Sequence, residues 1–529
     1  MTAPSTTAAA GRHSRRSQAS ARARGRARAP RRAVSVLLLA LVLGLSGVSS
    51  APAVAAQSKP RETTVSVTVD RTHPGAAVPQ QFLGMSFEMS ALAQMARYSD
   101  RGNLAAMLRS LGPGVLRFGG ASADTRIAWT DSRTPRPAWA TNVVDVDDLR
   151  ALAGLASASG WHIVLTVGIV HFEPQAAARE VAAAKGALGE WLSAIEIGNE
   201  PNAYAQHLMR AEPWSVLSYA EEVAAYRGAI EAAAPGIPVY GPDVSGSAAF
   251  EAWGPGEAVA EHPALLTGHH YPLGCEQTPP PSIARLLSPR IRAKEVGSMR
   301  RYVAISAAAG LQFRLDETNS VSCGGTSGIS NTFASALWAA GFLPQVMASG
   351  VVGVNMHGNP TNCKGYSPVC AAGPYELSIG QLTAQPEFYA LLMSRELIGS
   401  EPLRTAVKVR PQTANVQVSG FLAPDGRLRF VLVDYDPVGK RGVSVRLKVG
   451  AGFSAASTLA LTGQSLSALS GTELGEREVA PDGTWQAGST PTVAVRAGVA
   501  TIALPAASAA LVTVAPFAPA APAPSAPVG

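Results

Sequence analysis

The stretch Ala194-Ile-Glu-Ile-Gly-Asn-Glu-Pro-Asn202 decides the fold of this chain. The apolar run Leu192–Ile197 predicts a buried strand. Pro201 has no backbone N–H and disfavours helix at the residue before it, so strand pairing is expected to stop here. Asn199 and Glu200 would then stand at the carboxyl end of the strand, which is where α/β barrels carry their chemistry. The alternative is an ordinary strand-to-loop turn with a solvated Glu200.

Similar short apolar runs recur along the chain and alternate with Ala-rich stretches of helical spacing. This alternation, eight times over about 280 residues, predicts an α/β fold of the (β/α)8 TIM-barrel type in residues 79–400. The predicted strands are Phe82–Ser86, Val115–Phe118, His162–Val167, Leu192–Ile197, Ile237–Tyr240, Leu265–Gly268, Phe313–Leu315 and Val351–Asn355. The helical stretches include Val146–Ala158, Gln175–Ala187, Ser215–Ala233, Ile291–Ala309 and Asn331–Ala348.

The pattern changes near residue 400. Residues 401–515 alternate strand-like runs with turn signals such as Ala423-Pro-Asp-Gly426, which predicts a C-terminal antiparallel β-sandwich. Residues 57–78 contain the alternating run Thr63–Val69, which we expect to join that sandwich as an N-terminal strand. Residues 516–529 form an Ala/Pro-rich tail.

Residues 1–56 predict a secretory signal segment. Nine Arg and no acidic residue in residues 1–32 precede a short apolar run and a small-residue stretch. The apolar run is shorter than a comfortable membrane span, so an uncleaved anchor is only the alternative, and Arg31-Arg32 allows a twin-arginine signal. We therefore expect a secreted, extracellular protein without a stable membrane partner.

Removal of this segment changes the meaning of the charge. The net charge of +7 comes from 44 Lys+Arg against 37 Asp+Glu, and loss of the nine Arg leaves 35 against 37. The basic balance therefore gives no reason to expect a nucleic-acid partner, and no basic stripe with interleaved aromatic residues occurs elsewhere in the sequence.

A second carboxylate lies in a similar setting. The run Phe313-Arg-Leu-Asp-Glu317 predicts a strand that ends at Glu317, and by count Glu200 ends the fourth strand and Glu317 the seventh. These strand ends face each other across a barrel mouth. Glycoside hydrolysis needs two such carboxylates, one protonated for the leaving oxygen and one ionised to attack the anomeric carbon. At a separation of about 5–5.5 Å the reaction would retain configuration, and Asn199 could bind the adjacent sugar hydroxyl.

The residues around these carboxylates resemble glycoside hydrolase family 79, which belongs to the clan of retaining (β/α)8-barrel glycosidases. The similar segments are Gly84-Met-Ser-Phe-Glu88, Leu116-Arg-Phe-Gly-Gly120 with Asp124, Gly268-His-His-Tyr271, Glu317-Thr-Asn-Ser320, Gly328-Ile-Ser-Asn-Thr-Phe-Ala-Ser-Ala-Leu-Trp338 and Asn355-Met-His-Gly358. The family contains β-glucuronidases and heparanase-like enzymes, and it pairs the barrel with a β-sandwich built from both ends of the chain. The resemblance covers residues 63–515.

This resemblance implies roles for single residues. Glu200 corresponds to the acid/base, Glu317 to the nucleophile, and Tyr271 to the Tyr that hydrogen-bonds the nucleophile and favours its ionised form. Glu88 and Asp124 stand where the family contacts sugar hydroxyls. The alternatives are structural carboxylates, with Glu88 paired to Arg117.

The resemblance also bears on recognition of the sugar. Gly365-Tyr366 is similar to a Gly-Tyr pair that binds the carboxylate of a uronic acid, and a solvated loop residue is the alternative for Tyr366. Where an aromatic residue is expected after the nucleophile, this chain has Val321-Ser-Cys323, which leaves the identity of the sugar open.

Histidines and cysteines complete the expectations. His269 and His270 are adjacent, so they point to opposite faces of a strand and suggest packing and hydrogen bonding rather than a metal site. His357 is expected to line the site as a hydrogen bonder. We expect no metal and no organic cofactor.

Four cysteines permit three disulfide pairings in an exported protein, and no Cys-x-x-Cys pair suggests zinc. On the predicted barrel, Cys275 and Cys323 follow neighbouring strands, whereas Cys363 and Cys370 flank one loop. We therefore predict the disulfides Cys275–Cys323 and Cys363–Cys370, both of which would rigidify loops that line the site.

These observations together predict a secreted retaining β-glycosidase with a carbohydrate substrate. The first expectation is a β-glucuronidase that removes β-linked glucuronic acid or 4-O-methylglucuronic acid from glycans or glycosides by double displacement. The alternatives are a neutral-sugar β-glycosidase of the same clan, an endo-acting heparanase-like enzyme, and a non-catalytic glycan-binding protein.

Overall fold

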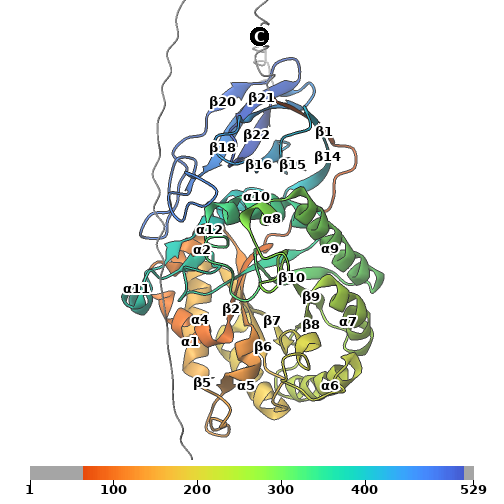
Figure 1. Cartoon of the computed structure of the whole chain (residues 1–529). Helices are drawn as coiled ribbons and strands as arrows, with labels where there is room; N and C mark the ends of the chain where they lie inside the picture. The colour runs from red at the N-terminus through yellow and green to blue at the C-terminus, as the bar shows by residue number, and fades with distance from the viewer. Residues whose placement is uncertain (1–62, 518–529) are drawn as a thin grey trace, which may run out of the picture. The chain divides into compact units, whose positions relative to one another are not determined.

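The computed structural model describes residues 63–517 (Figure 1). The predicted signal segment 1–56, the first residues of the segment 57–78 and almost all of the tail 516–529 lie outside the described residues. Within residues 63–517, no helix is both long enough and apolar enough to cross a membrane.

Eight parallel strands close into a barrel, as the alternating pattern predicts. In chain order they are β2 (Leu83–Glu88), β3 (Gly114–Gly119), β6 (Trp161–Val167), β7 (Leu192–Ile197), β8 (Val239–Ser245), β9 (Leu265–His270), β10 (Phe313–Thr318) and β11 (Gly353–Gly358), and β11 pairs back onto β2. Each overlaps the apolar run that predicts it. The strands are buried on both faces, because side chains fill the inside and helices cover the outside.

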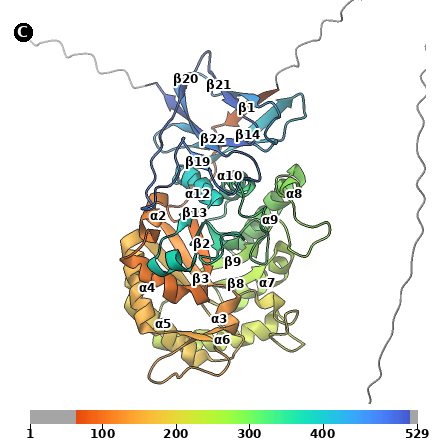
Figure 2. The ribbon, with the colours of Figure 1, turned by 60° about the vertical axis from the view of Figure 1, so that its left-hand side comes forward.

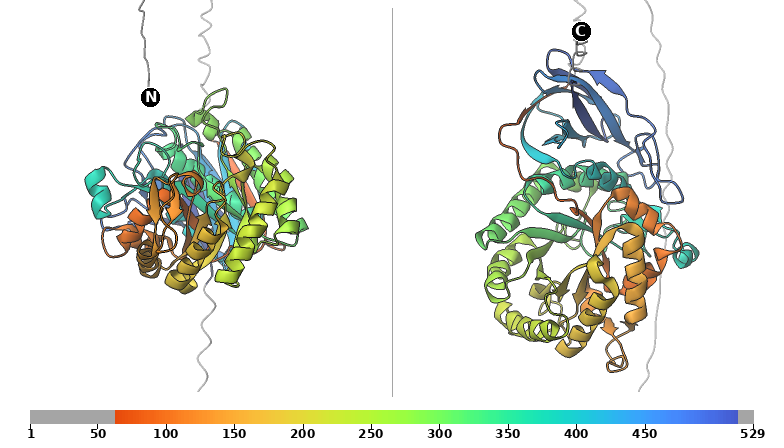
Figure 3. Two further views of the ribbon diagram at one scale, coloured as in Figure 1. Left: turned by 90° about the horizontal axis from the view of Figure 1, so that it is seen from below. Right: turned by 180° about the vertical axis from the view of Figure 1, so that it is seen from behind.

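Helices surround the barrel, as the right-hand view of Figure 3 shows. The longer ones are α2 (Leu104–Leu111), α4 (Val146–Ser159), α5 (Pro174–Leu188), α6 (Val216–Ala233), α7 (Ser247–Ala260), α9 (Pro289–Ala308), α10 (Phe333–Ala348) and α12 (Pro386–Arg395). The start and end of α4 illustrate why helices form here. The side chain of Asp145 accepts from the backbone N–H groups of Asp147 and Asp148, and Gly160 ends the helix in the left-handed conformation.

Short elements interrupt the alternation on the loops. They are α1 (Leu92–Ala96), α3 (Ala121–Thr125), α8 (Ile283–Leu286), α11 (Pro374–Ile379) and the strand pairs β4 (Ile127–Trp129) with β5 (Asn142–Val144) and β12 (Val369–Cys370) with β13 (Thr383–Ala384). A single turn of 3-10 helix at Pro201–Ala203 follows Glu200. These elements extend the loops on which side chains of the site are carried.

The second region is a β-sheet domain in which the N-terminal strand takes part, as predicted. Its strand order is β19-β18-β22-β16-β15-β14-β1-β17-β21, and β20 pairs with β18. The strands are β1 (Thr64–Asp70), β14 (Glu401–Arg410), β15 (Val416–Leu422), β16 (Leu428–Asp434), β17 (Val443–Lys448), β18 (Phe453–Thr462), β19 (Glu473–Leu474), β20 (Thr492–Ala494), β21 (Val499–Leu504) and β22 (Ser508–Pro516). Figure 2 shows the red strand β1 among blue strands from the other end of the chain. Pairing is antiparallel except between β1 and β17, which run parallel.

Helix α10 joins the two regions and is buried along most of its length. Gln417 on β15 donates to the carbonyl of Gly341, and Gln345 donates to the hydroxyl of Ser419. A side chain at Gly341 would place its Cβ 1.8 Å from the hydroxyl of Tyr435. Gly341 is therefore required for the close approach of the sheet domain to the barrel.

Candidate active site

The carboxyl ends of the barrel strands bring the two predicted carboxylates together. Glu317 lies on β10, and Glu200 follows β7. A carboxylate oxygen of Glu200, a ring nitrogen of His269 and a carboxylate oxygen of Glu317 all lie within 4.8 Å of one another. The convergence expected from the strand count is therefore present in the structure.

Glu317 is held by donors on both of its carboxylate oxygens. The hydroxyl of Tyr271, just after β9, donates to Oε1 at 2.8 Å, and Nη1 of Arg117 donates to Oε2 at 2.9 Å. Nδ1 of His269 lies 3.8 Å from Oε1, and Nδ1 of His357 lies 3.6 Å from Oε2. These contacts fix the orientation of a side chain that is only 9% exposed.

The same contacts determine the protonation of Glu317. Burial alone would raise its pKa, but the charges of His269, His357 and Arg117 and the hydrogen bond from Tyr271 together lower the pKa to about 2. Glu317 is therefore an ionised carboxylate throughout the neutral and mildly acidic range.

Glu200 occupies a different environment. Its side chain is 28% exposed, and its backbone has the left-handed conformation (φ 52°, ψ 50°) between Asn199 and Pro201. Its backbone N–H donates to the carbonyl of Asp243, and His269 donates to its carboxylate at 2.8 Å. The turn thus presents Glu200 at the mouth, where it can exchange protons with a bound molecule and with solvent.

His269 connects the two sides of the site. Its Nδ1 lies 2.8 Å from Glu200, and its Nε2 lies 2.7 Å from Asp243. Although burial would lower its pKa, the charges of Asp243 and Glu317 and the hydrogen bonds that His269 donates to Asp243 and Glu200 raise the pKa well above the ordinary value. His269 is therefore an imidazolium that donates from both nitrogens, and its role goes beyond the packing expected from the sequence.

Arg117 lies fully buried below these groups and uses all of its guanidinium nitrogens. It forms no hydrogen bond or ion pair with Glu88, so the pairing considered from the sequence is not found among the described residues. Its hydrogen-bond acceptors are Glu196 through Nε, Ser86 and Glu317 through Nη1, and Asn199 and Asp243 through Nη2. Because the guanidinium is planar and always charged, it sets the relative positions of carboxylates from three strands, β7, β8 and β10.

Asn199 is oriented by this arrangement. Its side-chain oxygen accepts from Arg117 at 3.0 Å, and no hydrogen bond within residues 63–517 uses its Nδ2. The free N–H groups of the amide are thus available as donors beside Glu200.

Asp124 takes the structural position that was the alternative to a sugar contact. It is 1% exposed, and its carboxylate accepts from the backbone N–H groups of Ile169 and Asn199 and from the hydroxyl of Tyr204. Burial raises its pKa to about 6, although these hydrogen bonds oppose the shift. Asp124 therefore ties the loop after β6 to the backbone of Asn199 and has no oxygen free for a ligand.

Glu88 stands at the end of β2 and is half-buried. Its Oε2 accepts from the backbone N–H of Ser122 at 2.9 Å. Gly120 has a positive φ of 71°, and a Cβ there would lie 2.5 Å from the carboxylate carbon of Glu88. The glycine lets the chain pass close to Glu88, whose other oxygen has no hydrogen-bond partner within residues 63–517.

Tyr366 packs over the nucleophile side of the site. Its ring stacks on that of Tyr271 with the centroids 5.9 Å apart, and the two hydroxyls are 3.2 Å apart. Its backbone N–H donates to the carbonyl of Gly324, and a Cβ at Gly365 would lie 2.0 Å from that same oxygen. The Gly365-Tyr366 pair is thus locked onto the loop after β10, and the Tyr366 amide is not free to bind a carboxylate.

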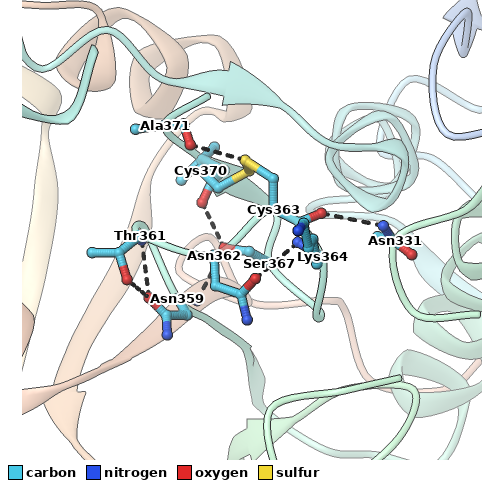
Figure 4. Close-up of a disulfide and its surroundings, with 10 residues drawn as sticks. Asn331, Asn359, Thr361, Asn362, Cys363, Lys364, Ser367, Cys370 and Ala371 are labelled. Atoms are coloured by element: carbon cyan, nitrogen blue, oxygen red, sulfur yellow. Dashed lines mark hydrogen bonds between the residues drawn. A yellow bond between two sulfur atoms is a disulfide. The ribbon is translucent and has the colours of Figure 1, made fainter. Parts of the chain in front are cut away.

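Both predicted disulfides are present. Cys275 bonds Cys323 across neighbouring loops, and Cys363 bonds Cys370 within the loop after β11. Figure 4 shows the latter loop, in which Asn359 accepts from Thr361 and Asn331 donates to the carbonyl of Cys363. This bracing holds Tyr366, which lies between Cys363 and Cys370, against the site.

Several charged residues of the site have no counterpart among the predicted site residues: Arg117, Glu196, Asp243, His269 and Asp316. Arg117 and Glu196 are the single charged residues of apolar strands, whereas Asp316 stands beside Glu317 and two residues after Arg314 on β10. In a barrel strand such a side chain must point inward and be paired, which is a signal that the sequence does carry. Asp243 has no comparable signal, because it follows Gly241-Pro242 in a stretch that resembles a turn.

Two groups of side chains could be considered for a metal ion: Glu200, His269 and Glu317, and Asp243, His269 and Asp316. Both depend on His269, and both nitrogens of His269 donate to carboxylates. A metal requires a nitrogen lone pair, so the arrangement of the described residues does not fit one.

No protein-family model and no curated protein matches the chain, but solved structures do. One is the crystal structure of a 4-O-α-L-rhamnosyl-β-D-glucuronidase from Fusarium oxysporum 12S with Rha-GlcA. It is 18% identical with a TM-score of 0.68, and the match covers 85% of this chain and 100% of that one.

Two other matches come from Xanthomonas axonopodis pv. citri. A GH51 arabinofuranosidase is 14% identical with a TM-score of 0.61, over 86% of this chain and 100% of that chain. A GH39 enzyme is 16% identical with a TM-score of 0.52, over 88% and 99%. At these identities the likeness shows a shared fold, a TIM barrel with a β-sheet domain.

Proposed function

We propose that this protein is a retaining glycoside hydrolase in which Glu317 is the nucleophile and Glu200 is the acid/base. One observation carries the proposal: carboxylate oxygens of Glu200 and Glu317 lie within 4.8 Å of each other in different environments. Retaining glycosidases keep their two carboxyl groups about 5–5.5 Å apart, whereas inverting ones need room for a water between them. The folds of the matched glycosidases support the same class of reaction.

In the proposed reaction each step falls to one side chain. Glu317 is ionised, and Tyr271 and Arg117 aim it at the mouth, so it attacks the anomeric carbon. Glu200 gives its proton to the leaving oxygen, and then takes a proton from the water that hydrolyses the glycosyl ester. The Nδ2 of Asn199 donates to the sugar hydroxyl next to the anomeric carbon, which is a contact that strengthens in the transition state.

For the sugar, we propose β-linked glucuronic acid. The supporting observations are the family-like segments around Glu317 and the fold match to a rhamnosyl-glucuronidase. A neutral β-linked sugar is the second candidate, because the Tyr366 amide expected to bind a uronate already donates to Gly324. The Arg-rich segment before residue 57 and the two disulfides support secretion.

A panel of aryl β-glycosides tests both levels of the proposal. We expect hydrolysis of the glucuronide above the glucoside, xyloside and galactoside, with the product released in the β configuration. A neutral-sugar preference would contradict the glucuronide assignment alone. Strong cleavage of polysaccharide with poor aryl-glycoside turnover would indicate an endo-acting enzyme, and binding without turnover would indicate a glycan-binding protein.

Variants test the residues. Glu317→Gln should lose at least about 10⁴-fold in kcat, because no other carboxylate can form the ester. Glu200→Ala should keep activity on aryl glycosides whose leaving groups need no proton, and lose it on alkyl glycosides. Glu190→Gln, at an exposed site before β7, is the matched control and should behave as the wild type. Full activity of Glu317→Gln would remove the proposal.

A further inference from the structure

Two carboxylates beneath the mouth lack hydrogen-bond donors. Oε1 of Glu196 and both oxygens of Asp316 are buried without a partner among residues 63–517. Neither residue is more than 1% exposed. Buried polar atoms are nearly always paired, so orphaned oxygens on two neighbouring acids require an explanation.

Arg117 and His269 cannot supply the missing donors, and Arg314, whose Nη2 is also buried without a partner, forms no ion pair with Glu196 or Asp316 among the described residues. Nε of Arg117 lies 3.9 Å from Asp316 and Nε2 of His269 lies 3.8 Å from it, which is too long for hydrogen bonds. Nε of Arg117 is already used by Glu196, and Nε2 of His269 by Asp243. The charged and titratable groups that face Asp316 are Arg117 on β3, Glu196 on β7, Asp243 on β8, His269 on β9, Tyr302 on α9, and Arg314 and Glu317 on β10 itself.

The net charge of the buried side chains also indicates that one of these acids carries a proton. Around Arg117 and His269 lie four buried carboxylates, those of Glu196, Asp243, Asp316 and Glu317. If all four were ionised, they would outnumber Arg117, His269 and the buried Arg314 and leave a net charge of about −1 away from water, which is unfavourable. One proton on one of these acids reduces the charge and also provides the missing donor.

We propose that Asp316 is a neutral carboxylic acid that donates its proton to Oε1 of Glu196, and that it is a positioning residue for Arg117 and Glu317. Glu196 is the acceptor because both oxygens of Asp243 are already engaged, by His269 and by Arg117. The shared O–H satisfies the orphaned oxygen of Glu196. Burial and the charges of Asp243 and Glu196 also raise the pKa of Asp316 well above its usual range.

A consequence for the reaction follows, and it rests on the proposed function. With Asp316 neutral, Arg117, His269 and Arg314 balance Glu196, Asp243 and Glu317, so the resting cluster has no net charge. An ionised Asp316 would instead leave one uncompensated negative charge beside Arg117 and weaken the hold of Arg117 on Glu317.

Infrared spectroscopy tests the proton without reference to activity. Protein labelled with ¹³C at the aspartate carboxyl groups is compared with its Asp316→Asn variant at neutral pH. We expect Asp316→Asn to lose intensity in the carbonyl stretch of protonated carboxyl groups. Loss of carboxylate intensity instead would overturn the proposal, and this result would stand even if the protein hydrolysed no glycoside.

Kinetics test the positioning role. Asp316→Ala should lower kcat/KM at least about 10-fold, and Asp316→Asn should recover most of that loss, because an amide also donates to Glu196. The acidic and basic limbs of the pH profile of kcat/KM should have the same midpoints in Asp316→Asn as in the wild type. Removal of an ionised Asp316 would instead shift both limbs down by about two pH units, as expected for a charge one residue shell away at an effective dielectric constant of about 20. Such a shift, or the absence of rescue by Asn, would refute the proposal.

Thr267→Val is the matched control. Thr267 is also fully buried on the neighbouring strand β9 with an unpartnered hydroxyl, but it belongs to no charged group of the site. The variant should keep kcat/KM and the pH profile. If it loses as much as Asp316→Ala, the loss reflects damage to the barrel and the positioning role is refuted.

Discussion

The hydrogen bond from Tyr271 to Glu317 makes a quantitative prediction. Tyr271→Phe removes one donor at 2.8 Å from Oε1 and leaves the aromatic ring in place against Tyr366. Arg117 at 2.9 Å still binds the other oxygen, and His269 at 3.8 Å and His357 at 3.6 Å still contribute their charges. The variant therefore isolates a single stabilising contact of the ionised carboxylate.

The size of the effect can be worked out from the environment. A hydrogen bond to a charged acceptor contributes about 1.5–3 kcal/mol, and one pKa unit corresponds to about 1.36 kcal/mol. Since the Glu317 side chain is only 9% exposed, water replaces little of the lost bond. The pKa of Glu317, about 2 in the intact protein, should rise by about 1–2 units in the variant.

The assay is the pH dependence of kcat/KM on an aryl glycoside, whose acidic limb reports the essential base of the free enzyme. We expect that limb to move upward in Tyr271→Phe and activity near pH 6 to fall at least about 10-fold, because the contact also serves the transition state. Tyr366→Phe is the control, because the hydroxyl of Tyr366 hydrogen-bonds that of Tyr271 and not Glu317. This variant should shift the acidic limb less than Tyr271→Phe does. An acidic limb that stays in place or moves downward would refute the assigned role of Tyr271.

Three further predictions concern stability. Burial raises the pKa of Glu257 and of Glu387 from 4.5 to about 8, so their stabilising effect is complete below pH 4.5 and is lost as the pH rises through about 8. The free energy of unfolding from denaturant titrations should fall across that range by up to about 1.4 kcal/mol per pH unit per group. Glu257→Gln should flatten the plot of this free energy against pH, and an unchanged slope of that plot would contradict the burial argument. Removal of Cys275–Cys323, with a sequence separation of 48, should lower the free energy of unfolding by about 4 kcal/mol. Removal of Cys363–Cys370, with a separation of 7, should lower it by about 2.5 kcal/mol. The reverse order in urea unfolding of the two double Cys→Ser variants would contradict the chain-entropy account. Gly341→Ala should destabilise by about 1–3 kcal/mol, because the new Cβ meets Tyr435, while the kcat of the folded protein stays unchanged; an equally stable variant would show that the two regions can separate at little cost.

The barrel could be predicted from sequence because its strands are short apolar runs whose pattern depends on local burial. Leu192–Ile197 was predicted with the same bounds as β7, since Gly198 and Pro201 mark its end. Elements that depend on tertiary contacts had no such pattern. The two-residue strands β12 and β13, for example, exist because the loop after β11 folds back on itself.

Some residues of the site could likewise be predicted from the sequence, and others could not. Glu200, Glu317 and Tyr271 are polar residues where apolar runs end, so their position at the mouth follows from strand order. The partners of Arg117 did not follow, because they come from five different strands or loops and are set by the barrel's closure. The contacts of Asp124 were also not predictable: a carboxylate near the mouth suggested a ligand contact, and in the structure it accepts from backbone N–H groups of two loops.

Strand β1 has a consequence for how the chain is made. It lies between β14 and β17 in the sheet, so its first partner begins more than 330 residues later in the sequence. During synthesis the whole barrel leaves the ribosome while β1 still has both edges unpaired and exposed. The edges of β1 are covered only after Lys448 has emerged, and the sheet is complete only after Pro516, because β22 pairs with β16 and β18. The sheet domain is therefore completed after all eight barrel strands have been made.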